Sequence, residues 1–446
     1  MFKSGEKSNI RNYRGITNLS AASKLFEIIV NRSLLAGMKC YISTDQHGFM
    51  PGRSVTTNLL EFTHTCFTQL EAKCQVDVVY TDLKAAFDRI DHRILLRKIN
   101  LLGASDSFVA WLSSYLCDRS LRVKLGACSS TPFVNLSGVP QGSNLGPLLF
   151  TIFLNDVSIL LGDGCKLIYA DDLKLYFAVK CIEDCHRLQQ LLDMFVEWCH
   201  RNKLIVSIPK CSVMTFHRNS QPIMFNYHID GVVLNRVEEM NDLGVTMDKK
   251  LSFASHRSAV IAKANRQLGF ITKIAKDFND PYCLKALYCS LVRPILENAS
   301  LVWLPHQLTW SLRIERVQKR FVRIALRNLP WRDPQNLPPY CDRCKLINLD
   351  TLARRRKIQQ ATFVAKLLNN GVDCPKLLSL LDFRVPSRAS RTSTLLQTWF
   401  HRTAFGFNAP MSSMIRAFTS AEDLFEFGER SSCFSSRVAR SACFTL

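Results

Sequence analysis

The chain has 446 residues, of which 47% are hydrophobic, with 18 glycines and 16 prolines. This composition is typical of a folded protein of two or three domains and excludes a disordered chain. Lysine and arginine number 58 against 37 acidic residues, a net charge of +21. Such an excess favours a polyanionic partner, nucleic acid or an anionic membrane surface, although a merely soluble basic protein carries the same signature.

The sequence has no mark of secretion or of membrane insertion. Its first seven residues are mostly polar and include no secretory apolar stretch, and the longest apolar run, from Leu145 to Leu154, is far shorter than a bilayer span. The 17 cysteines are odd in number and follow no framework spacing, which indicates reduced thiols. We therefore expect an intracellular protein of the nucleus or cytoplasm, neither secreted nor bound to a membrane.

Helical and loop patterns alternate over the first hundred residues. Apolar spacing predicts helices over 21–35 and 57–70, with a Gly/Pro loop at 46–54 between them. A buried strand over 76–80 stops at Thr81-Asp82, and helical spacing then runs over 85–101. Asp82 thus lies at the carboxyl end of a strand, where side chains of many α/β layouts face a cleft. Its alternative role is to cap the following helix.

The middle of the chain mixes helices and short strands. We predict a helix over 107–117, strands over 121–125 and 131–136, a Gly/Pro loop over 138–146 and an apolar helix over 147–155. Strand patterns then flank two adjacent carboxylates, Asp171 and Asp172. Strands disfavour Asp and neighbouring carboxylates repel, so we predict a hairpin tip that offers both to a divalent metal.

The last part of the chain becomes helical. A helix is expected over 182–203 and short β-like segments up to 250, and from Phe253 onward helical spacing prevails. One late helix carries a basic stripe at helical spacing: Arg313, Arg316, Arg320, Arg323 and Arg327. This stripe is equally well interpreted as a contact to a phosphate backbone or as the solvated face of an amphipathic helix.

The acids suggest a reaction class. Nucleotidyl transfer uses two divalent ions, and carboxylates from separate parts of a fold must converge to hold them. Asp82 with Asp171 and Asp172 meets that requirement. A Tyr-x-Asp-Asp tetrapeptide alone is weak evidence, so the argument depends on the ordered set of motifs around it.

That set resembles the reverse transcriptases of non-LTR retrotransposons. Asp-Leu-Lys-Ala-Ala-Phe-Asp at 82–88 resembles their motif A, Ser-Gly-Val-Pro-Gln-Gly-Ser-Asn-Leu-Gly-Pro at 137–147 their motif B, and Tyr-Ala-Asp-Asp at 169–172 their motif C. Segments 12–16 and 46–54 look like finger motifs, and 198–210 and 243–245 like motifs D and E. Residues 291–297 and the arginine-rich helix look like the region that follows the palm in jockey-type elements.

The resemblance implies an α+β right-hand polymerase. Fingers and palm would occupy 1–250, a helical thumb-like region 251–335 and a C-terminal helical extension 336–446. The expected activity is RNA-directed DNA synthesis from an RNA template, a DNA primer and dNTPs. The alternative is an inactive or domesticated nucleic-acid-binding remnant. The family's upstream endonuclease domain is absent from this sequence, so we expect an element truncated at its N-terminus.

The resemblance also assigns residues. Asp82, Asp171 and Asp172 would hold two Mg²⁺ ions, with Mn²⁺ as the substitute, and the carbonyl of Leu83 would assist. Phe87 would exclude a ribose 2′-hydroxyl, Arg14 would contact the triphosphate, and Gln141 and Gly142 would line the nucleotide pocket. Lys210 would be the general acid toward pyrophosphate. The sequence departs from the family at Gly15, where Pro is usual, and at Ser207, where Asn is usual.

Overall fold

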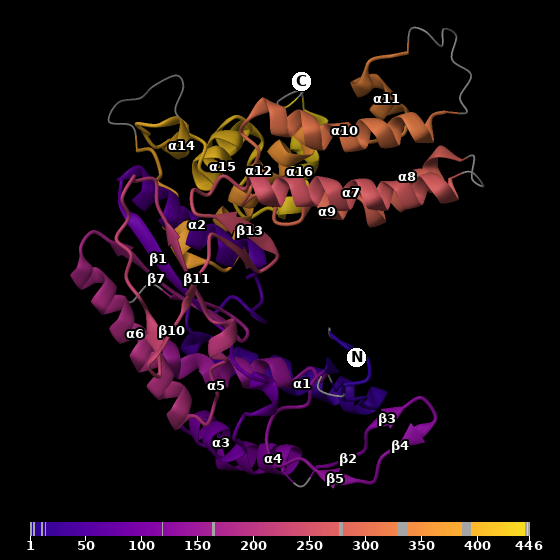
Figure 1. Ribbon diagram of the computed structural model, residues 1–446. Helices are drawn as coiled ribbons and strands as arrows, with labels where there is room; N and C mark the ends of the chain where they lie inside the picture. The colour runs from indigo at the N-terminus through magenta and orange to yellow at the C-terminus, as the bar shows by residue number, and fades with distance from the viewer. Residues whose placement is uncertain are drawn as a thin grey trace. The chain divides into compact units, whose positions relative to one another are not determined.

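The computed structural model describes the chain except for residues 1, 3, 4, 10, 11, 14, 118, 163–165, 276–279, 328–336, 386–393, 442, 443, 445 and 446. The chain divides into two units (Figure 1). The first comprises Met1–Pro51, Val76–Thr215 and Gln221–Val237, and the second comprises Gly52–Gln75, Phe216–Ser220 and Glu238–Leu446. Helices and strands are mixed in both, which confirms the expected α+β class.

A five-stranded sheet is the centre of the first unit, with strand order β11-β8-β1-β7-β6. The helices of this unit are α1 (Ala21–Met38), α3 (His92–Leu101), α4 (Asp106–Leu116), α5 (Gly146–Leu160) and α6 (Ile182–Arg201), with 3₁₀ turns η2 (Lys39–Tyr41), η3 (Ala86–Asp88) and η4 (Ile208–Lys210). Its strands are β1 (Gln75–Thr81), β2 (Ser120–Leu121), β3 (Lys124–Leu125), β4 (Cys128–Ser129), β5 (Phe133–Val134), β6 (Lys166–Tyr169), β7 (Asp172–Val179), β8 (Ser212–Phe216), β9 (His228–Ile229), β10 (Val232–Val233) and β11 (Asn235–Arg236).

The core of this unit lies between the sheet and two helices. α6 packs on β7, and α5 contacts both α6 and α3. α5 is apolar around most of its circumference, with Phe150, Ile152 and Phe153 all buried, as expected of a helix enclosed by neighbours. This core supports β1 and β7, the neighbouring strands at whose ends the acidic side chains lie.

Polar caps fix where several helices begin. The side chain of Ser20 accepts the Ser23 N–H at the start of α1, and Asp91 accepts the Ile94 N–H at the start of α3. Such caps satisfy donors that have no partner within the helix, and each stabilises the helix by roughly 1 kcal/mol. Burial is the largest single influence and would raise the pKa of Asp91. The hydrogen bond and charge of Lys203 (Nζ–Oδ2 2.6 Å), together with the backbone N–H groups at the start of α3, outweigh it, and the pKa lies below its usual value.

The helix predicted over 85–101 is wrong in its first half. Ala85 adopts a left-handed φ of +52°, the short turn η3 follows, and a regular helix begins only at His92. Asp91, and not Asp82, is the capping residue. The strands predicted over 121–125 and 131–136 are also shorter than expected. They form two small ladders, in which β2 pairs with β5 and β3 with β4.

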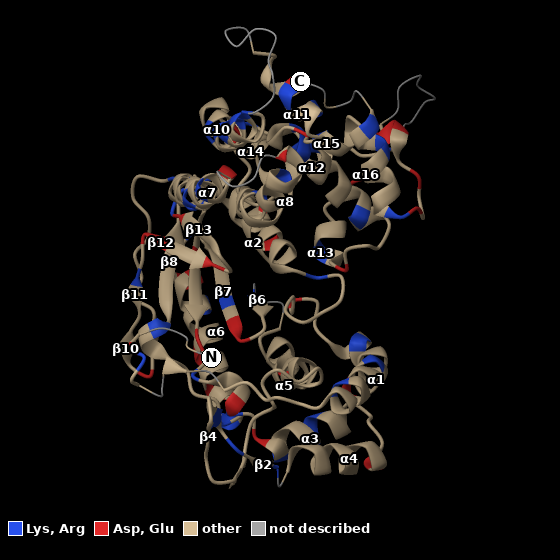
Figure 2. Ribbon diagram, turned by 90° about the vertical axis from the view of Figure 1, so that its right-hand side faces the viewer, with Lys and Arg blue, Asp and Glu red and all other residues tan. Residues whose placement is uncertain are grey.

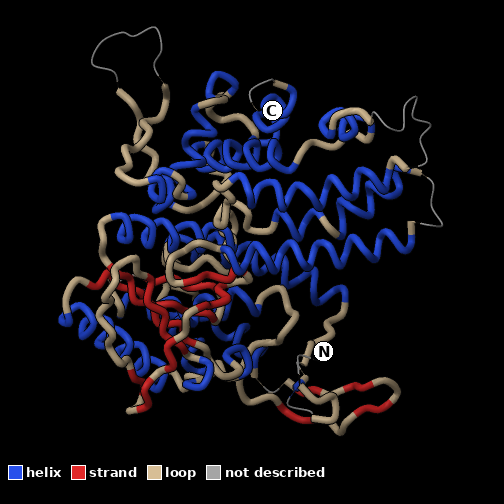
Figure 3. The backbone as a smooth tube through the Cα atoms, turned by 45° about the horizontal axis from the view of Figure 1, so that its top comes forward, coloured by secondary structure: helices blue, strands red, loops and turns tan. Residues whose placement is uncertain are grey.

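The second unit is mostly helical (Figure 3). It contains α2 (Val55–Glu71), α7 (Ala254–Ile274), α8 (Pro281–Leu291), α9 (Arg293–Glu297), α10 (Leu308–Ala325), α11 (Tyr340–Leu346), α12 (Leu352–Leu368), α13 (Pro375–Leu378), α14 (Ala404–Phe407), α15 (Pro410–Thr419) and α16 (Ser431–Arg440), the turn η5 (Glu422–Leu424), and the hairpin β12 (Glu239–Asp242) and β13 (Val245–Asp248). α7 packs on α10, α8 and α9, and α12 packs on α15 and α16.

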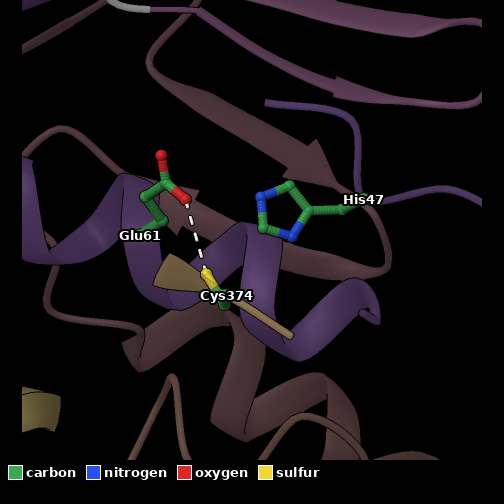
Figure 4. Close-up of side chains that lie close together, drawn as sticks. All are labelled: His47, Glu61 and Cys374. Carbon is green, nitrogen blue, oxygen red and sulfur yellow. Dashed lines mark hydrogen bonds between the residues drawn. The ribbon is translucent and has the colours of Figure 1, made fainter. Parts of the chain in front are cut away.

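Helix α2 belongs to this unit although it precedes β1 in the chain. It contacts α13, α14 and α15. The Cys374 thiol donates to the buried Glu61 carboxylate (Sγ–Oε2 3.7 Å; Figure 4), and Lys376 forms an ion pair with the same group at 2.8 Å. At the end of α2, Glu71 binds His401 at 3.0 Å. Segments more than three hundred residues apart are thereby joined by buried or half-buried polar contacts.

Every cysteine in the described part of the chain is a free thiol. Burial raises the pKa of Cys199 to about 12 and also raises that of Cys211, so both stay protonated at neutral pH. Within the residues that the structure covers, none of the helices combines the length and apolar character needed to cross a bilayer.

Candidate active site

Asp82 directly follows β1 and projects from its carboxyl end. Its side chain is 29% exposed, and its Oδ2 lies 2.9 Å from Nζ of Lys210. The preceding residue, Thr81, donates its hydroxyl to the carbonyl of Leu173 on β7 (2.9 Å). Because Leu173 immediately follows Asp172, this bond brings the backbone positions next to Asp82 and Asp172 side by side.

The segment after α6 fixes the backbone around Asp82. Ser207 donates its N–H to the Asp82 carbonyl (2.7 Å), and Lys84 donates to the carbonyl of Ile205 (2.8 Å). In an antiparallel ladder, these two bonds leave Leu83 between them with its own N–H and C=O directed away from the 205–207 segment. The Leu83 carbonyl is therefore not consumed by this pairing.

The carboxylate pair of Asp171 and Asp172 lies at a tight hairpin, as the sequence suggested. β6 and β7 are antiparallel, and their last pair is Tyr169 with Asp172. Ala170 and Asp171 form the two-residue turn, with Ala170 at a left-handed φ of +57°. Two-residue hairpin turns that match the twist of the flanking strands have a positive φ at their first central residue, as Ala170 does. The turn leaves Asp171 at the tip and Asp172 at the first position of β7.

A loop from the first fifty residues supports this hairpin. Gln46 pairs with Ile168 in a parallel bridge, and the His47 N–H donates to the Ile168 carbonyl (2.8 Å). The Gln46 side-chain oxygen accepts the N–H groups of Gly48 (2.9 Å) and Ala170 (3.3 Å). A Cβ on Gly48 would lie only 2.3 Å from the Ala170 nitrogen, so the loop approaches the hairpin as closely as it does because position 48 is glycine.

The three acids lie at one edge of the sheet, and their donor chemistry fits a divalent cation. Carboxylate oxygens are the ligands that Mg²⁺ prefers, and Asp82 already accepts a cation in the form of the Lys210 ammonium. Among the described residues, the oxygens of Asp82, Asp171 and Asp172 do not all lie within 4.8 Å of one another. Three like charges repel at shorter range unless positive charge compensates them.

The turn η3 places Phe87 next to α5. The Phe87 ring stacks on that of Phe150, with centroids 4.2 Å apart and planes 11° from parallel. The Phe49 ring contacts the Phe87 ring edge to face, with centroids 6.1 Å apart. Phe87 is half-buried, and the stack on Phe150 fixes the orientation of its ring.

The loop before α5 docks onto the segment after Asp82. Gly138, at φ +86°, donates its N–H to the Ile90 carbonyl (2.8 Å), and any Cβ there would meet the Phe87 carbonyl oxygen at 2.8 Å. Gln141 donates its side-chain amide to Asp88 (Nε2–Oδ1 2.7 Å). These contacts join the two segments that resemble motifs A and B.

The first finger-like segment reaches the same loop. Thr17 donates its N–H to the Gln141 carbonyl (2.8 Å), and a Cβ on Gly142 would lie 3.2 Å from the Ile16 side chain. Gly142 is exposed and adopts a φ of +96°. Arg14, predicted to contact the triphosphate, lies outside the described residues.

Two residues of this region were not recognised from the sequence. Glu27, in the middle of α1, accepts a hydrogen bond from the backbone of the motif B loop, and Gln46 buttresses the hairpin. A carboxylate inside an otherwise apolar stretch, Leu25-Phe26-Glu27-Ile28-Ile29, was the available signal for Glu27. For Gln46, no pattern in the sequence reveals its contact with the hairpin, because Ala170 lies more than a hundred residues away.

The arginine stripe forms a regular exposed face on α10. The buried side includes Ile314, Val317 and Phe321. Arg313, Arg316, Arg320 and Arg323 are all exposed, and within the described residues none of them lies within 4.0 Å of a carboxylate oxygen (Figure 2, blue on α10). Arg313 lies over the Trp310 ring at 4.4 Å.

Comparison with known proteins agrees with the motif order. The family described as reverse transcriptase (RNA-dependent DNA polymerase) matches residues 4–247. The chain is 29% identical over 332 residues to the probable RNA-directed DNA polymerase from transposon BS of Drosophila melanogaster, and 29% identical over 341 residues to the RNA-directed DNA polymerase from mobile element jockey of Drosophila funebris. Each alignment covers 72% of this chain and 36% of the relative, so the chain spans about a third of their length.

Among solved structures, apo telomerase from Candida tropicalis is similar over 76% of this chain and 53% of its own, at 12% identity and a TM-score of 0.40. The family match covers more than half of the sequence and includes all three acidic positions. The sequence-based recognition is thus confirmed, and with it the right-hand polymerase fold class. This chain belongs to the reverse transcriptase (RNA-dependent DNA polymerase) family and is similar to the polymerases of jockey-like non-LTR elements.

Proposed function

We propose that this chain catalyses RNA-directed DNA synthesis, adding deoxynucleotides to the 3′-end of a DNA primer along an RNA template. The observation that carries the proposal is the sheet order, in which β1 and β7 are neighbours and Asp82 and Asp172 stand at adjoining strand ends. Carboxylates converging from separate segments are what metal-assisted phosphoryl transfer requires.

Asp82, Asp171 and Asp172 are proposed to hold two Mg²⁺ ions, with Mn²⁺ as the substitute and the Leu83 carbonyl as an additional ligand. When bound, such ions activate the attacking 3′-oxygen and neutralise charge on the triphosphate. Two observations support this assignment. The acids offer oxygen ligands at the adjoining ends of β1 and β7, and the Leu83 carbonyl points away from the 205–207 segment.

The nucleotide pocket is proposed to lie between η3 and the motif B loop. Phe87 would exclude a ribose 2′-hydroxyl, because its stack on Phe150 prevents the ring from turning aside. Gln141 and Gly142 would line the pocket, and the glycine leaves room for close approach of the substrate. Arg14 would bind the triphosphate as a fixed positive charge.

Lys210 is proposed to be the general acid that protonates the pyrophosphate leaving group. Its ammonium group lies 2.9 Å from Asp82, and its side chain is 58% exposed. It would therefore stand within reach of a triphosphate bound through metal ions at the same acid. A lysine in this position can also neutralise the charge that develops on the leaving oxygen.

The nucleic-acid duplex is proposed to bind a basic thumb face. We assign fingers and palm to 1–250, a thumb-like region to 251–335 and a C-terminal extension to 336–446. The support is the exposed arginine face of α10, which falls within the thumb-like region, and the net charge of +21. RNA template, DNA primer and dNTPs are the partners that this arrangement would take.

Primer extension tests the proposed function directly. The purified chain would receive a primed RNA template, dNTPs and Mg²⁺, beside Asp171→Ala/Asp172→Ala and a control with two exposed acids of α6 replaced, Asp193→Ala/Glu197→Ala. We expect extension by the unmodified chain and by the control, and none by the 171/172 variant. Equal template binding by all three proteins without extension by any would contradict the proposal and favour a binding function alone.

A further inference from the structure

Glu27 is a buried carboxylate on a helix whose neighbouring residues face solvent. It is 2% exposed, whereas Phe26 and Ile28 on either side are 52% and 36% exposed. Helices normally place apolar residues inward and carboxylates outward. Burying a carboxylate is costly unless hydrogen bonds replace the lost water, so the inward position of Glu27 needs specific partners.

Both carboxylate oxygens have such partners. Oε1 accepts the hydroxyl of Tyr115 on α4 at 2.6 Å, and Oε2 accepts the backbone N–H of Asn144 at 2.7 Å. Burial and the hydrogen bond to Glu27 both raise the pKa of Tyr115, so this hydroxyl stays protonated and remains the donor. The α1 carboxylate is thus a bridge between α4 and the loop that leads into α5.

Asn144 is held by α1 at two further atoms. Its carbonyl accepts the side-chain amide of Asn31 at 2.7 Å, and its own amide donates to the Lys24 carbonyl at 3.2 Å. Lys24, Glu27 and Asn31 follow one another at spacings of three and four, so they share one face of the helix. This α1 clamp fixes one residue of the motif B loop through its N–H, its carbonyl and its side chain.

The clamped residue lies two positions after Gly142 and three after Gln141. At the other end of the loop, Gln141 binds Asp88 and Gly138 binds Ile90. Hydrogen bonds therefore hold the loop to α1 at one end and to the segment that follows Asp82 at the other. We infer that Glu27 is a positioning residue that sets Gln141 and Gly142 for nucleotide binding, an inference that rests on the proposed function.

Substitutions at Glu27 separate positioning from general destabilisation. Glu27→Ala removes the acceptor of the Asn144 N–H. Glu27→Gln can keep both contacts, because its oxygen can accept from Asn144 while its amide donates to the Tyr115 hydroxyl, which then acts as acceptor. Leu25→Ala, on the exposed side of the same helix, is the matched control.

The first readout is hydrogen exchange of the backbone amides, which requires no catalysis. For Glu27→Ala we expect exchange in residues 141–146 to accelerate about tenfold, with the β6–β7 amides unchanged. Glu27→Gln and Leu25→Ala should stay within about threefold of the unmodified chain. Unchanged exchange at 141–146, or equal acceleration across β6–β7, would overturn the positioning role whether or not the chain extends primers.

The second readout is steady-state primer extension. Glu27→Ala should raise the KM for dNTP about tenfold with a smaller loss in kcat, and Glu27→Gln should restore the KM. If kcat falls and KM does not change, the inference is wrong. An inactive unmodified chain would refute the proposed function, and the exchange measurement would still decide whether Glu27 holds the loop.

Discussion

The Lys210–Asp82 pair illustrates how the site differs from ordinary surface chemistry. With side chains 58% and 29% exposed, an isolated ion pair of this kind contributes about 0–1 kcal/mol to stability, because water and salt screen it. The ion pair therefore contributes little to the stability of the folded chain. Its position at the end of β1, fixed by the Ser207–Asp82 backbone bond, is better explained by chemistry at that carboxylate.

Replacing Lys210 should affect catalysis more than folding. We expect Lys210→Gln to lower kcat by about 10²–10⁴-fold, because proton donation to the leaving group is lost. Lys210→Arg keeps the positive charge but donates a proton poorly, since a guanidinium remains protonated at neutral pH, so its kcat should fall nearly as far. Single-turnover primer extension measures both, and thermal unfolding should change little.

The control for this experiment is Lys203→Gln, which removes the exposed partner of Asp91. Its kcat should stay close to that of the unmodified chain. A normal rate for Lys210→Gln would contradict the role as general acid. A normal rate for Lys210→Arg alone would reduce the role of Lys210 to electrostatic stabilisation.

At the level of single residues, the sequence predicted the acids but not their supports. Asp82, Asp171 and Asp172 stand out because they interrupt apolar strand patterns, which is a local signal. Glu27 and Gln46 act through backbone partners more than a hundred positions away in the chain. Such partners are set by tertiary packing, and no local pattern in one sequence encodes them.

At the scale of secondary-structure elements, the loop at 46–48 packs so closely on the β6–β7 hairpin that a change in one should displace the other. Gly48→Ala would force a Cβ to within 2.3 Å of the Ala170 backbone, and neither side can yield without displacing the turn that carries Asp171. We expect primer extension by this variant to fall at least a hundredfold, since small misplacements at a catalytic centre are costly. Circular dichroism should show that the helices remain.

Gly37→Ala is the matched control for that substitution. Nothing lies within 4 Å of a Cβ at this position, which is inside α1. Alanine is favoured over glycine within a helix, so this variant should keep its activity and gain about 0.5–1 kcal/mol of stability. Equal activity of the two variants would mean that the close approach at Gly48 does not position the hairpin.

A buried histidine on α7 should make the stability of the second unit depend on pH. Nδ1 of His256 accepts the Thr246 N–H at 3.2 Å, and burial together with the neighbouring Arg257 charge lowers the pKa of His256 to about 4. Its pKa in the unfolded chain is about 6.5, so between these values the unfolded state binds more protons. The free energy of unfolding must therefore decrease as the pH falls from 6.5 toward 4.

His256→Asn tests this linkage, because the asparagine oxygen can accept the same N–H without titrating. Between pH 7 and pH 5 the unmodified chain should lose about 2 kcal/mol more than the variant, the shift expected of one such group. Urea unfolding at the two pH values, followed by tryptophan fluorescence, gives the difference. Parallel losses in both proteins would show that His256 does not titrate on unfolding.

The segment after Asp82 shows why element prediction failed where it did. Residues 85–91 have helical spacing, yet the carbonyls of Phe87 and Ile90 accept N–H groups from the motif B loop. A regular helix would use those carbonyls internally. Tertiary hydrogen bonds thus override the local preference at the point where two motifs meet, and the regular helix begins only after Asp91.

For the whole molecule, the sequence predicted the class of fold well. A buried strand before Asp82, a long apolar helix and a helical second half are properties of pattern and composition, and these agree with the structure. The grouping of α2 with the C-terminal helices was not visible, because it depends on contacts of Glu61 and Glu71 with residues beyond 370. Contacts across such separations are fixed by the three-dimensional packing alone.

The net charge of +21 makes salt dependence the natural test of the α10 face. Each phosphate neutralised by a cationic side chain adds about 0.9 to the slope of log K against log salt. We expect Arg316→Gln/Arg320→Gln/Arg323→Gln to reduce that slope by roughly 2 to 3 when binding of a primed RNA template is titrated between 50 and 200 mM salt.

A control must remove the same charge elsewhere, and Arg93→Gln/Arg97→Gln/Arg201→Gln does so at exposed positions of α3 and α6. If binding depends only on net charge, both triple variants should lose the same affinity. If the α10 face makes a defined contact, only the α10 variant should change the slope of log K against log salt. The stripe would then be a binding surface and not a solvated helix face. Equal slopes for the two variants would favour the solvated face, the interpretation that the sequence alone left equally open.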